Sequence, residues 1–203
     1  MRHIRNIAPR VTVYPLGSAP PSVEPGWIAL GQLPQVPGCR RVFGDGSHAT
    51  TRLCAAAIDL LCRQRQPEAV LDVGTGTGVL ARIARARGAR SIVATEIDPV
   101  ALSCAKAHAD LDAHPVQIHF TSEVPDHCGA RFDLVVANIL EEPLRSMAPA
   151  LCRALLPGGV MLLSGFTRLQ MPALRVLYEN AGLSFFRCSS LEGWALLTFM
   201  SKH

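Results

Sequence analysis

The sequence predicts an α/β fold in which an open, mostly parallel sheet of seven strands carries helices on both faces. From residue 51 onward, short apolar runs alternate with segments of helical periodicity, as expected for repeated strand–helix units. A glycine-rich turn directly follows the apolar run 70–73 and opens the next helix. After residue 182 two apolar runs flank a Glu-Gly turn, which predicts an antiparallel hairpin at the end of the sheet.

Each element of this fold follows from a local pattern. Residues 51–64 begin the series as an amphipathic helix, because apolar side chains recur on one side. Asp98 and Pro99 supply an N-cap and a first-turn proline for a later helix. Apolar runs predict strands at 70–73, 91–96, 116–120, 132–137, 160–164, 183–189 and 194–200. The remaining helices are expected at 78–87, 99–111, 141–154 and 172–180.

The first 42 residues differ from the rest, because they hold seven of the fifteen prolines. Their composition predicts an extended N-terminal arm over residues 1–42, wrapped over a domain that occupies residues 43–203. The short apolar pieces Val11–Tyr14 and Trp27–Leu30 are expected as edge strands within this arm.

Size and composition indicate one compact domain, since 203 residues with 49% hydrophobic and 18% charged content can bury a single core. The seven cysteines form no Cys-x-x-Cys pair and the seven histidines show no ligand spacing, so we expect no metal and a reduced, cytoplasmic setting. No apolar run approaches the length of a transmembrane helix, so no membrane partner is expected. The net charge of +4 is modest and predicts no nucleic-acid partner; a solvated helix face explains the arginines Arg82, Arg85, Arg87 and Arg90.

The glycine turn carries the main functional signal. Residues 70–78 read Val-Leu-Asp-Val-Gly-Thr-Gly-Thr-Gly, and Glu96 ends the next apolar run about twenty residues later. A strand, a glycine turn and a distant carboxylate predict a site for a nucleotide-like cofactor whose ribose hydroxyls meet the acid. The dinucleotide fingerprint would place its third glycine at Val79, and the acid Asp72 is unexpected beside a pyrophosphate. Both features favour S-adenosylmethionine, and a nicotinamide cofactor is the alternative.

The residues of this loop have separate expected roles. Gly74 and Gly76 bring the backbone close to the ligand, which only residues without Cβ permit, whereas Gly78 is expected to serve helix–strand packing. Asp72 is expected to orient the loop or to reach the cofactor's ammonium group through water; the alternative is a carboxylate that caps nearby backbone amides. Glu96 is expected to hold the ribose diol through two hydrogen bonds of about 1.5–3 kcal/mol each.

Two further candidate positions follow predicted strands. Thr121 and Ser122 come after the strand at 116–120, where they either contact adenine or supply ordinary loop polarity. Asn138 ends the strand at 132–137, at the sheet edge where ligands bind in open α/β folds. Its amide carbonyl could hold the hydrogens of an amine and direct the nitrogen lone pair at a methyl group, which makes Asn138 the candidate catalytic residue. The alternative is a turn asparagine that only ends the strand.

A second glycine-rich segment, Phe-Gly-Asp-Gly-Ser-His-Ala-Thr-Thr-Arg at 43–52, leads to a known family. Together with the loop at 70–78, Asn-Ile-Leu-Glu-Glu-Pro-Leu at 138–144 and Glu-Gly-Trp at 192–194, it resembles the methyltransferases that modify ribosomal protein L11. The likeness covers residues 25–201, with four separated motifs in the family's order. A sheet that ends in one reversed strand is also the class I methyltransferase architecture, a Rossmann-like fold.

The resemblance implies which positions bind the cofactor, namely Thr51, Gly74, Glu96 and Asn138, with flanking contacts from Phe43 and Thr50. His48 is expected to be a structural or lid residue. The chain departs from the family pattern at Asp45, where the family has threonine, and at Thr75, where cysteine is usual. Glu96 likewise stands where aspartate is common.

The expected activity is an S-adenosylmethionine-dependent N-methyltransferase that releases S-adenosylhomocysteine. A neutral amine attacks the methyl carbon in line with the departing sulfur, so the protein mainly supplies alignment and a dry pocket. The family's separate N-terminal substrate domain has no counterpart in the sequence, so the acceptor is either a protein amine, such as lysine, or a small-molecule amine. Glu141 and Glu142 either attract a cationic substrate or form a solvated helix start.

Two other functions stay open at this point. One is a catalytically inactive accessory subunit that still binds S-adenosylmethionine. The other is an O- or S-methyltransferase that acts on a small molecule. The residue pattern predicts no oligomeric state.

Overall fold

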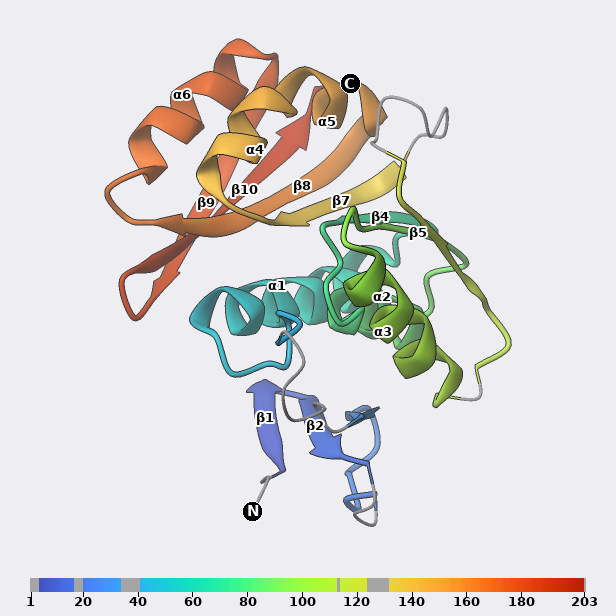
Figure 1. The fold of residues 1–203 in the computed structure, drawn as a ribbon. Coiled ribbons are helices and arrows are strands. Elements are labelled where there is room, and N and C mark those ends of the chain that lie inside the picture. Colours follow the sequence, from blue (N-terminus) through green and yellow to red (C-terminus); the bar gives the residue numbers. More distant parts are fainter. Residues whose placement is uncertain (1–3, 17–19, 34–40, 113, 124–131, 203) are drawn as a thin grey trace.

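A seven-stranded sheet forms the centre of the molecule in the computed structural model, which describes residues 4–16, 20–33, 41–112, 114–123 and 132–202 (Figure 1). The strands lie in the order β6-β5-β4-β7-β8-β10-β9. Their bounds are β4 Ala69–Val73, β5 Ser91–Thr95, β6 Ile118–Thr121, β7 Phe132–Asn138, β8 Leu155–Thr167, β9 Leu183–Leu191 and β10 Trp194–Ser201. Neighbours from β6 to β8 are parallel, and β10 runs antiparallel to both β8 and β9. The predicted mostly parallel sheet with a terminal hairpin is therefore confirmed.

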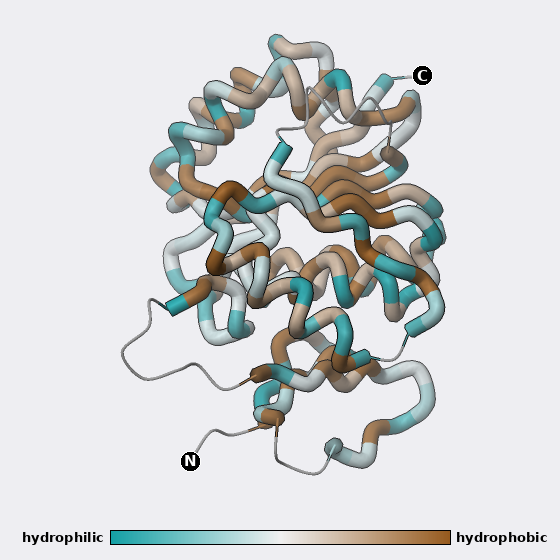
Figure 2. Tube along the Cα trace, turned by 45° about the vertical axis from the view of Figure 1, so that its right-hand side comes forward, coloured by the Kyte–Doolittle hydropathy of each residue, from teal (hydrophilic) through white to brown (hydrophobic). Residues whose placement is uncertain are grey.

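Helices cover both faces of this sheet, with α1, α2 and α3 on one side and α4, α5 and α6 on the other (Figure 1). Their bounds are α1 Ala49–Arg65, α2 Val79–Ala86, α3 Pro99–Asp110, α4 Glu141–Ser146, α5 Ala148–Ala154 and α6 Met171–Asn180. Alternate strand residues face alternate layers: Val70 and Val136 join the core under α1 and α2, whereas Leu71 and Val135 join the core under α4 to α6. Figure 2 shows these central strands as largely hydrophobic, as a sheet buried on both faces requires.

Two predicted boundaries are wrong. The helix expected at 141–154 is interrupted at Met147, because Pro149 in the first turn of α5 has no amide hydrogen to continue the ladder of α4. The strand expected at 160–164 is longer, since Leu155 already pairs with Phe132 before a register shift leads to the Leu134–Val160 pair.

The N-terminal segment contains a small sheet of its own. Strands β1 Arg5–Ala8, β2 Val11–Pro15 and β3 Ile28–Gln32 form it in sequence order, with β1–β2 antiparallel and β2–β3 parallel. The expected strands at 11–14 and 27–30 are thus present, but they pair with each other rather than with an edge of the main sheet. This sheet lies on the far side of α1 from the main sheet (Figure 1), and its apolar side chains share the core under α1 and α2. The division of the chain at residue 42 stays a prediction.

The expectation of a solvated arginine face is wrong for Arg82 and Arg85 of α2, whereas Arg90, which lies beyond this helix, is 78% exposed. The side chains of Arg82 and Arg85 are only 1% and 2% exposed, and both pair with Asp112 at 2.5 and 2.6 Å. The small N-terminal sheet covers this helix face, and Arg82 donates a hydrogen bond of 2.9 Å to the Gly31 carbonyl of β3. Helical spacing alone does not reveal such a cover.

Candidate functional site

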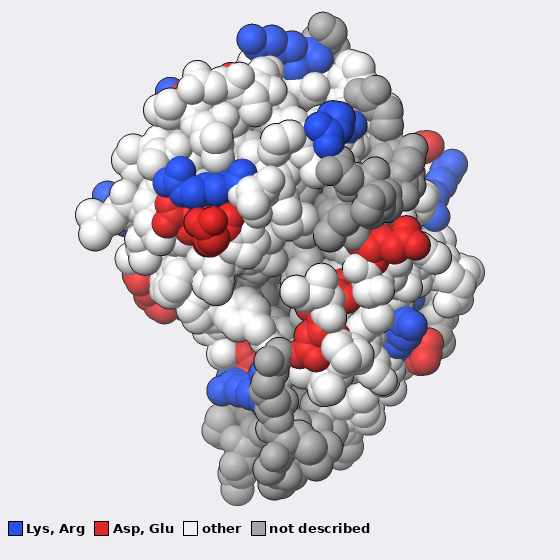
Figure 3. Space-filling view, turned by 45° about the horizontal axis from the view of Figure 1, so that its top comes forward, with Lys and Arg blue, Asp and Glu red and all other residues white. Residues whose placement is uncertain are grey.

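A cavity of about 670 Å³ lies at the carboxyl ends of β4, β5, β7 and β8, where ligands bind in open α/β sheets. The space-filling view in Figure 3 shows acidic side chains beside a hollow on this face. Three acids, Glu96, Asp98 and Glu123, line the cavity, and its one lining cation among the described residues is Arg41. Six of the nine predicted site residues also line it: Phe43, Thr50, Gly74, Gly76, Glu96 and Asn138.

The glycine loop and the segment at 43–52 are held together by backbone contacts. Gly76 has φ +57°, and a Cβ there would lie 2.5 Å from the Phe43 carbonyl oxygen, so no side chain fits. That oxygen accepts a 3.0 Å hydrogen bond from the Thr77 amide, while the Thr77 hydroxyl donates to the Gly44 carbonyl at 2.7 Å. Residues 33 positions apart in sequence, Gly44 and Thr77, therefore join the two motifs into one wall of the cavity.

Gly78 packs closely, but against a helix rather than against a strand as expected. A Cβ at this position, which has φ +80°, would lie 3.2 Å from the Ala105 Cβ on α3. Gly78 does not line the cavity, in contrast to Gly74 and Gly76.

Glu96 is fixed by two backbone amides. Its Oε2 accepts from the Gly76 amide at 3.0 Å, and its Oε1 accepts from the Asp98 amide at 3.0 Å. An ionised carboxylate has about four lone-pair sites, so one on each oxygen is left for hydroxyl donors. The loop geometry thus presents a preoriented, half-buried carboxylate to the cavity.

Asp72 lies beneath the loop rather than in the cavity. Its side chain is 1% exposed, and its Oδ2 accepts from the Thr75 hydroxyl at 2.6 Å and from the Ala81 amide at 3.1 Å. Burial raises the pKa of this carboxyl from 3.8 to about 6, although both hydrogen bonds oppose the rise. These contacts agree with the capping alternative for Asp72, because the carboxylate ties the loop to the first turns of α2.

Two other predicted positions also lie outside the cavity lining. Thr51 is 1% exposed in the first turn of α1, and its hydroxyl has no hydrogen-bond partner in the described part of the chain. Ser122 is exposed after β6, while its neighbour Glu123 does line the cavity. Their assignment to the cofactor stays a prediction.

An aromatic group forms one side of the cavity mouth. The His48 ring packs edge-on between Phe43 and Trp194, with centroid distances of 5.2 and 4.6 Å. The same ring caps α1, since Nδ1 accepts from the Thr50 amide at 3.3 Å. Arg52 on α1 pairs with Glu192 in the β9–β10 turn, which joins the 43–52 segment to the hairpin.

Asn138 ends β7 opposite Ser164 of β8 and lines the cavity. Its Oδ1 is buried, and among the described residues nothing donates a hydrogen bond to it. A buried acceptor without a donor costs about 1–3 kcal/mol, so such atoms in native sites commonly await a ligand or water. Sequence reasoning missed the neighbouring Gly165, although a glycine directly after the predicted strand at 160–164 was a visible signal.

Glu141 is engaged within the fold. Its Oε1 accepts from Arg145 at 2.6 and 2.8 Å, and its Oε2 accepts from the Gln170 amide group at 2.5 Å. Gln170 in turn accepts from the Thr167 amide at 2.8 Å. Glu141 therefore links the start of α4 to the β8–α6 turn, while Glu142 is exposed as a solvated helix start would be.

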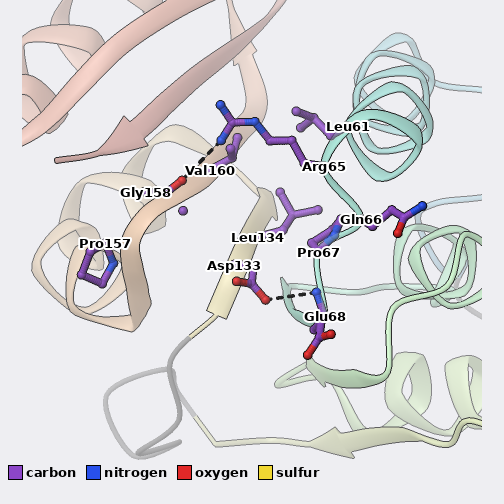
Figure 4. A pocket seen from close by; sticks show the side chains of 11 residues that line it. Leu61, Arg65, Gln66, Pro67, Glu68, Asp133, Leu134, Pro157, Gly158 and Val160 are labelled. Carbon is purple, nitrogen blue, oxygen red and sulfur yellow. Dashed lines mark hydrogen bonds between the residues drawn. The ribbon is translucent and has the colours of Figure 1, made fainter. Parts of the chain in front are cut away.

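A second hollow of about 350 Å³ lies at the opposite, amino-terminal edge of the sheet (Figure 4). Polar groups that line it form hydrogen bonds within the protein. Asp133 accepts from the amides of Glu68 and Ala69 at 3.1 and 2.8 Å, and Arg65 donates to the Gly158 carbonyl. Within the described ranges, no His, Cys, Asp or Glu side chains group as metal ligands. No helix in those ranges is both long enough and apolar enough to cross a bilayer.

Comparisons with known proteins point to one family. The family model described as ribosomal protein L11 methyltransferase (PrmA) matches residues 36–202. The ribosomal protein L11 methyltransferase of Bradyrhizobium diazoefficiens is 40% identical over 160 residues, which are 76% of this chain and 54% of that protein. The protein of the same name from Syntrophotalea carbinolica is 35% identical over 187 residues, which are 89% of this chain and 60% of that protein. The chain thus spans a little over half the length of these curated relatives.

Solved structures of methyltransferases share the fold of this chain. A ribosomal protein L11 methylase from Lactobacillus delbrueckii subsp. bulgaricus superposes with a TM-score of 0.85 at 27% identity, covering 99% of this chain and 100% of that chain. Magnesium protoporphyrin IX methyltransferase from Synechocystis PCC 6803, solved with bound SAM, shares the fold at a TM-score of 0.61 and 19% identity, over 81% of this chain and 87% of that chain. By its sequence and its fold, this chain belongs to the ribosomal protein L11 methyltransferase family.

Proposed function

We propose that this chain binds S-adenosylmethionine in the cavity at the carboxyl edge of the sheet and methylates an amine nitrogen. When bound, the cofactor supplies an electrophilic methyl group on a sulfonium. The chain's own residues then have three tasks: to hold the donor, to orient the acceptor and to exclude water.

The residues present fit this cofactor. Gly74 and Gly76 leave backbone without Cβ at the cavity wall, which permits close approach of a ligand. Glu96 keeps one free lone pair on each carboxylate oxygen after bonding to two amides, which matches the two hydroxyls of a ribose. We assign Gly74, Gly76 and Glu96 to cofactor binding, with Phe43 and Thr50 from the neighbouring wall.

The observation that carries the reaction type is the Oδ1 of Asn138, which accepts no hydrogen bond from any residue that the structure describes. A carbonyl oxygen can accept a hydrogen bond from a neutral amine. The lone pair of the amine nitrogen then points away from this oxygen and toward the methyl donor. Nearby cavity walls are apolar, from Ile97, Ile139, Leu140 and Met147. Apolar surroundings lower the pKa of an amine, which favours the neutral form that must attack. No strong general base is needed beyond this arrangement.

A protein amine is the first acceptor to test, because the curated relatives are named for a ribosomal protein. The chain should be incubated with tritiated S-adenosylmethionine and either purified bacterial ribosomal protein L11 or a small-molecule fraction of cell extract. Alkali-stable label in the protein fraction is the expected result, since methyl esters hydrolyse under alkali whereas N-methyl groups do not. Cofactor binding without transfer to any fraction would support an inactive accessory subunit instead, and alkali-labile label would indicate an O-methyltransferase.

The role of Asn138 has its own test. Asn138→Ala removes the carbonyl oxygen, and we expect kcat to fall on the order of 100-fold, the size seen when one oriented polar group is lost from an active site. The dissociation constant for S-adenosylmethionine, measured by calorimetry, should change less than about three-fold. Asn180→Ala, at an exposed position ending α6, is the matched control. Unchanged turnover in Asn138→Ala would remove this residue from the mechanism.

A further inference from the structure

Ile139 lies between two glycines that belong to the neighbouring strands on either side. It directly follows β7, which is flanked in the sheet by β4 and β8. Gly74 follows β4 and Gly165 lies near the end of β8, and all three residues line the cavity. One residue therefore contacts the ends of both flanking strands at the edge where the cavity opens.

The contacts on the two sides use different parts of Ile139. On the β4 side, a Cβ added to Gly74 would overlap the Cγ2 methyl of Ile139, so this methyl rests on the bare backbone of the glycine loop. On the β8 side, the three atoms nearest to an added Cβ at Gly165 are the carbonyl oxygen, carbonyl carbon and amide nitrogen of Ile139. Gly165 has φ +98°, which also disfavours any other residue there.

The chain on both sides of Ile139 is tethered to the same scaffold. Asn138 pairs with Ser164 in the last rung between β7 and β8. Glu141 is bonded to Gln170 of the β8–α6 turn at 2.5 Å. The backbone at Ile139 is thus fixed against β8. The Cγ2 methyl of the same residue contacts Gly74 in the loop after β4.

We propose that Ile139 is a positioning residue, which sets the distance between the donor loop at Gly74 and the acceptor-side Asn138 through its Cγ2 methyl. This inference rests on the proposed function, since it takes Gly74 as a donor contact and Asn138 as the acceptor contact. Methyl transfer needs the attacking nitrogen, the methyl carbon and the departing sulfur in line, and a misplacement of about 1 Å can cost roughly 100-fold in rate. Ile139 touches the donor loop through its side chain and directly follows Asn138 in the chain, so it keeps both halves of the site in register.

Three substitutions separate this role from simple packing. Ile139→Leu keeps the volume and hydrophobicity of the side chain but lacks the β-branch that provides Cγ2. Ile139→Val keeps the β-branch and loses only the terminal Cδ1 methyl. Ile92→Leu is the matched control, because it makes the same isomeric change at a buried site (2% exposed) near the opposite end of β5.

We expect kcat to fall about 10- to 100-fold in Ile139→Leu and to stay within about two-fold of the native value in Ile139→Val. The KM for the acceptor and the melting temperature should change little in either variant, and Ile92→Leu should keep its kcat. Equal kcat values for the leucine and valine variants would overturn the inference. So would a loss of kcat in Ile139→Leu that is matched by the same loss in Ile92→Leu.

A second readout does not depend on turnover. In nitrogen-15 correlation spectra, Ile139→Leu should shift both the Gly74 backbone amide and the Asn138 side-chain amide, whereas Ile139→Val should shift them much less. If the native protein transfers no methyl group, the proposed function fails while these spectra still judge the contact. If the native protein is active and the spectra and kcat of Ile139→Leu are unchanged, the positioning role fails alone.

Discussion

Replacing Glu96 with glutamine tests the donor site directly, because the geometry around this carboxylate limits what an amide can do. The two oxygens accept from the Gly76 and Asp98 amides, each at 3.0 Å. A glutamine side chain has only one oxygen, and its NH2 group would face one of these two backbone amides whichever way it turns. One backbone donor thus loses its acceptor, and one ribose hydroxyl meets a neutral group instead of a charged oxygen.

The magnitude follows from that count. A hydrogen bond to a charged group contributes about 1.5–3 kcal/mol, so losing one such bond to the ribose should weaken cofactor binding by about 10- to 150-fold. Glu96→Asp keeps the charge but shortens the reach by one methylene, so its loss should be smaller. Turnover at saturating cofactor should change little in either variant, since Glu96 holds the donor and does not meet the acceptor.

Calorimetric titration with S-adenosylmethionine measures the effect. The control is Glu68→Gln, which makes the same change in a side chain that is 74% exposed and lies at the other end of the sheet. An affinity change below about three-fold in Glu96→Gln, or an equal change in the control, would refute this reading of the carboxylate.

Two stability predictions complete the set. His108 accepts the Leu33 amide at 2.9 Å and holds its other ring nitrogen 3.1 Å from the Thr77 carbonyl, and burial lowers its pKa from 6.5 to about 4. Neutral His108 contributes about 3 kcal/mol of stability, which is complete above about pH 6.5 and is lost as the pH falls toward 4. In urea unfolding across this range, the free energy of unfolding should depend less on pH in His108→Gln than in the native protein. Asp112→Ala leaves two buried guanidinium groups unpaired and should cost about 3–5 kcal/mol in the same assay, whereas the exposed Asp110→Ala should cost under about 0.5 kcal/mol. A pH profile unchanged in the histidine variant, or equal losses in the two aspartate variants, would contradict these readings.

Local patterns were sufficient to predict the sheet and much of the site. The strand–glycine–helix unit predicted that Gly74, Gly76 and Glu96 lie together, and the structure brings all three to one cavity. Such placement depends on the carboxyl ends of parallel strands meeting at one edge of the sheet, which follows once the strand–helix alternation predicts a parallel sheet. The motif at 43–52 was identified by resemblance, and its backbone contact with the glycine loop could not be read from spacing.

Features that depend on tertiary packing could not be predicted in this way. The arginines of α2 have the spacing of a solvated face, yet Arg82 is buried between Asp112 and the Gly31 carbonyl of the N-terminal sheet. Gly165 and Ile139 gain their importance from a contact between neighbouring strands, which no single segment encodes. Asp72 was predicted with two roles, and its burial beneath the loop agrees with the capping one.

The small N-terminal sheet has a practical consequence for how this protein is divided into fragments. The family match begins at residue 36, after β1, β2 and β3. A fragment cut at that boundary would bare the apolar side of α1 and α2 and leave the Arg82 guanidinium without the Gly31 carbonyl. The stretch that matches the family is therefore shorter than the stretch that packs into one core, and a fragment made for expression should begin before β1.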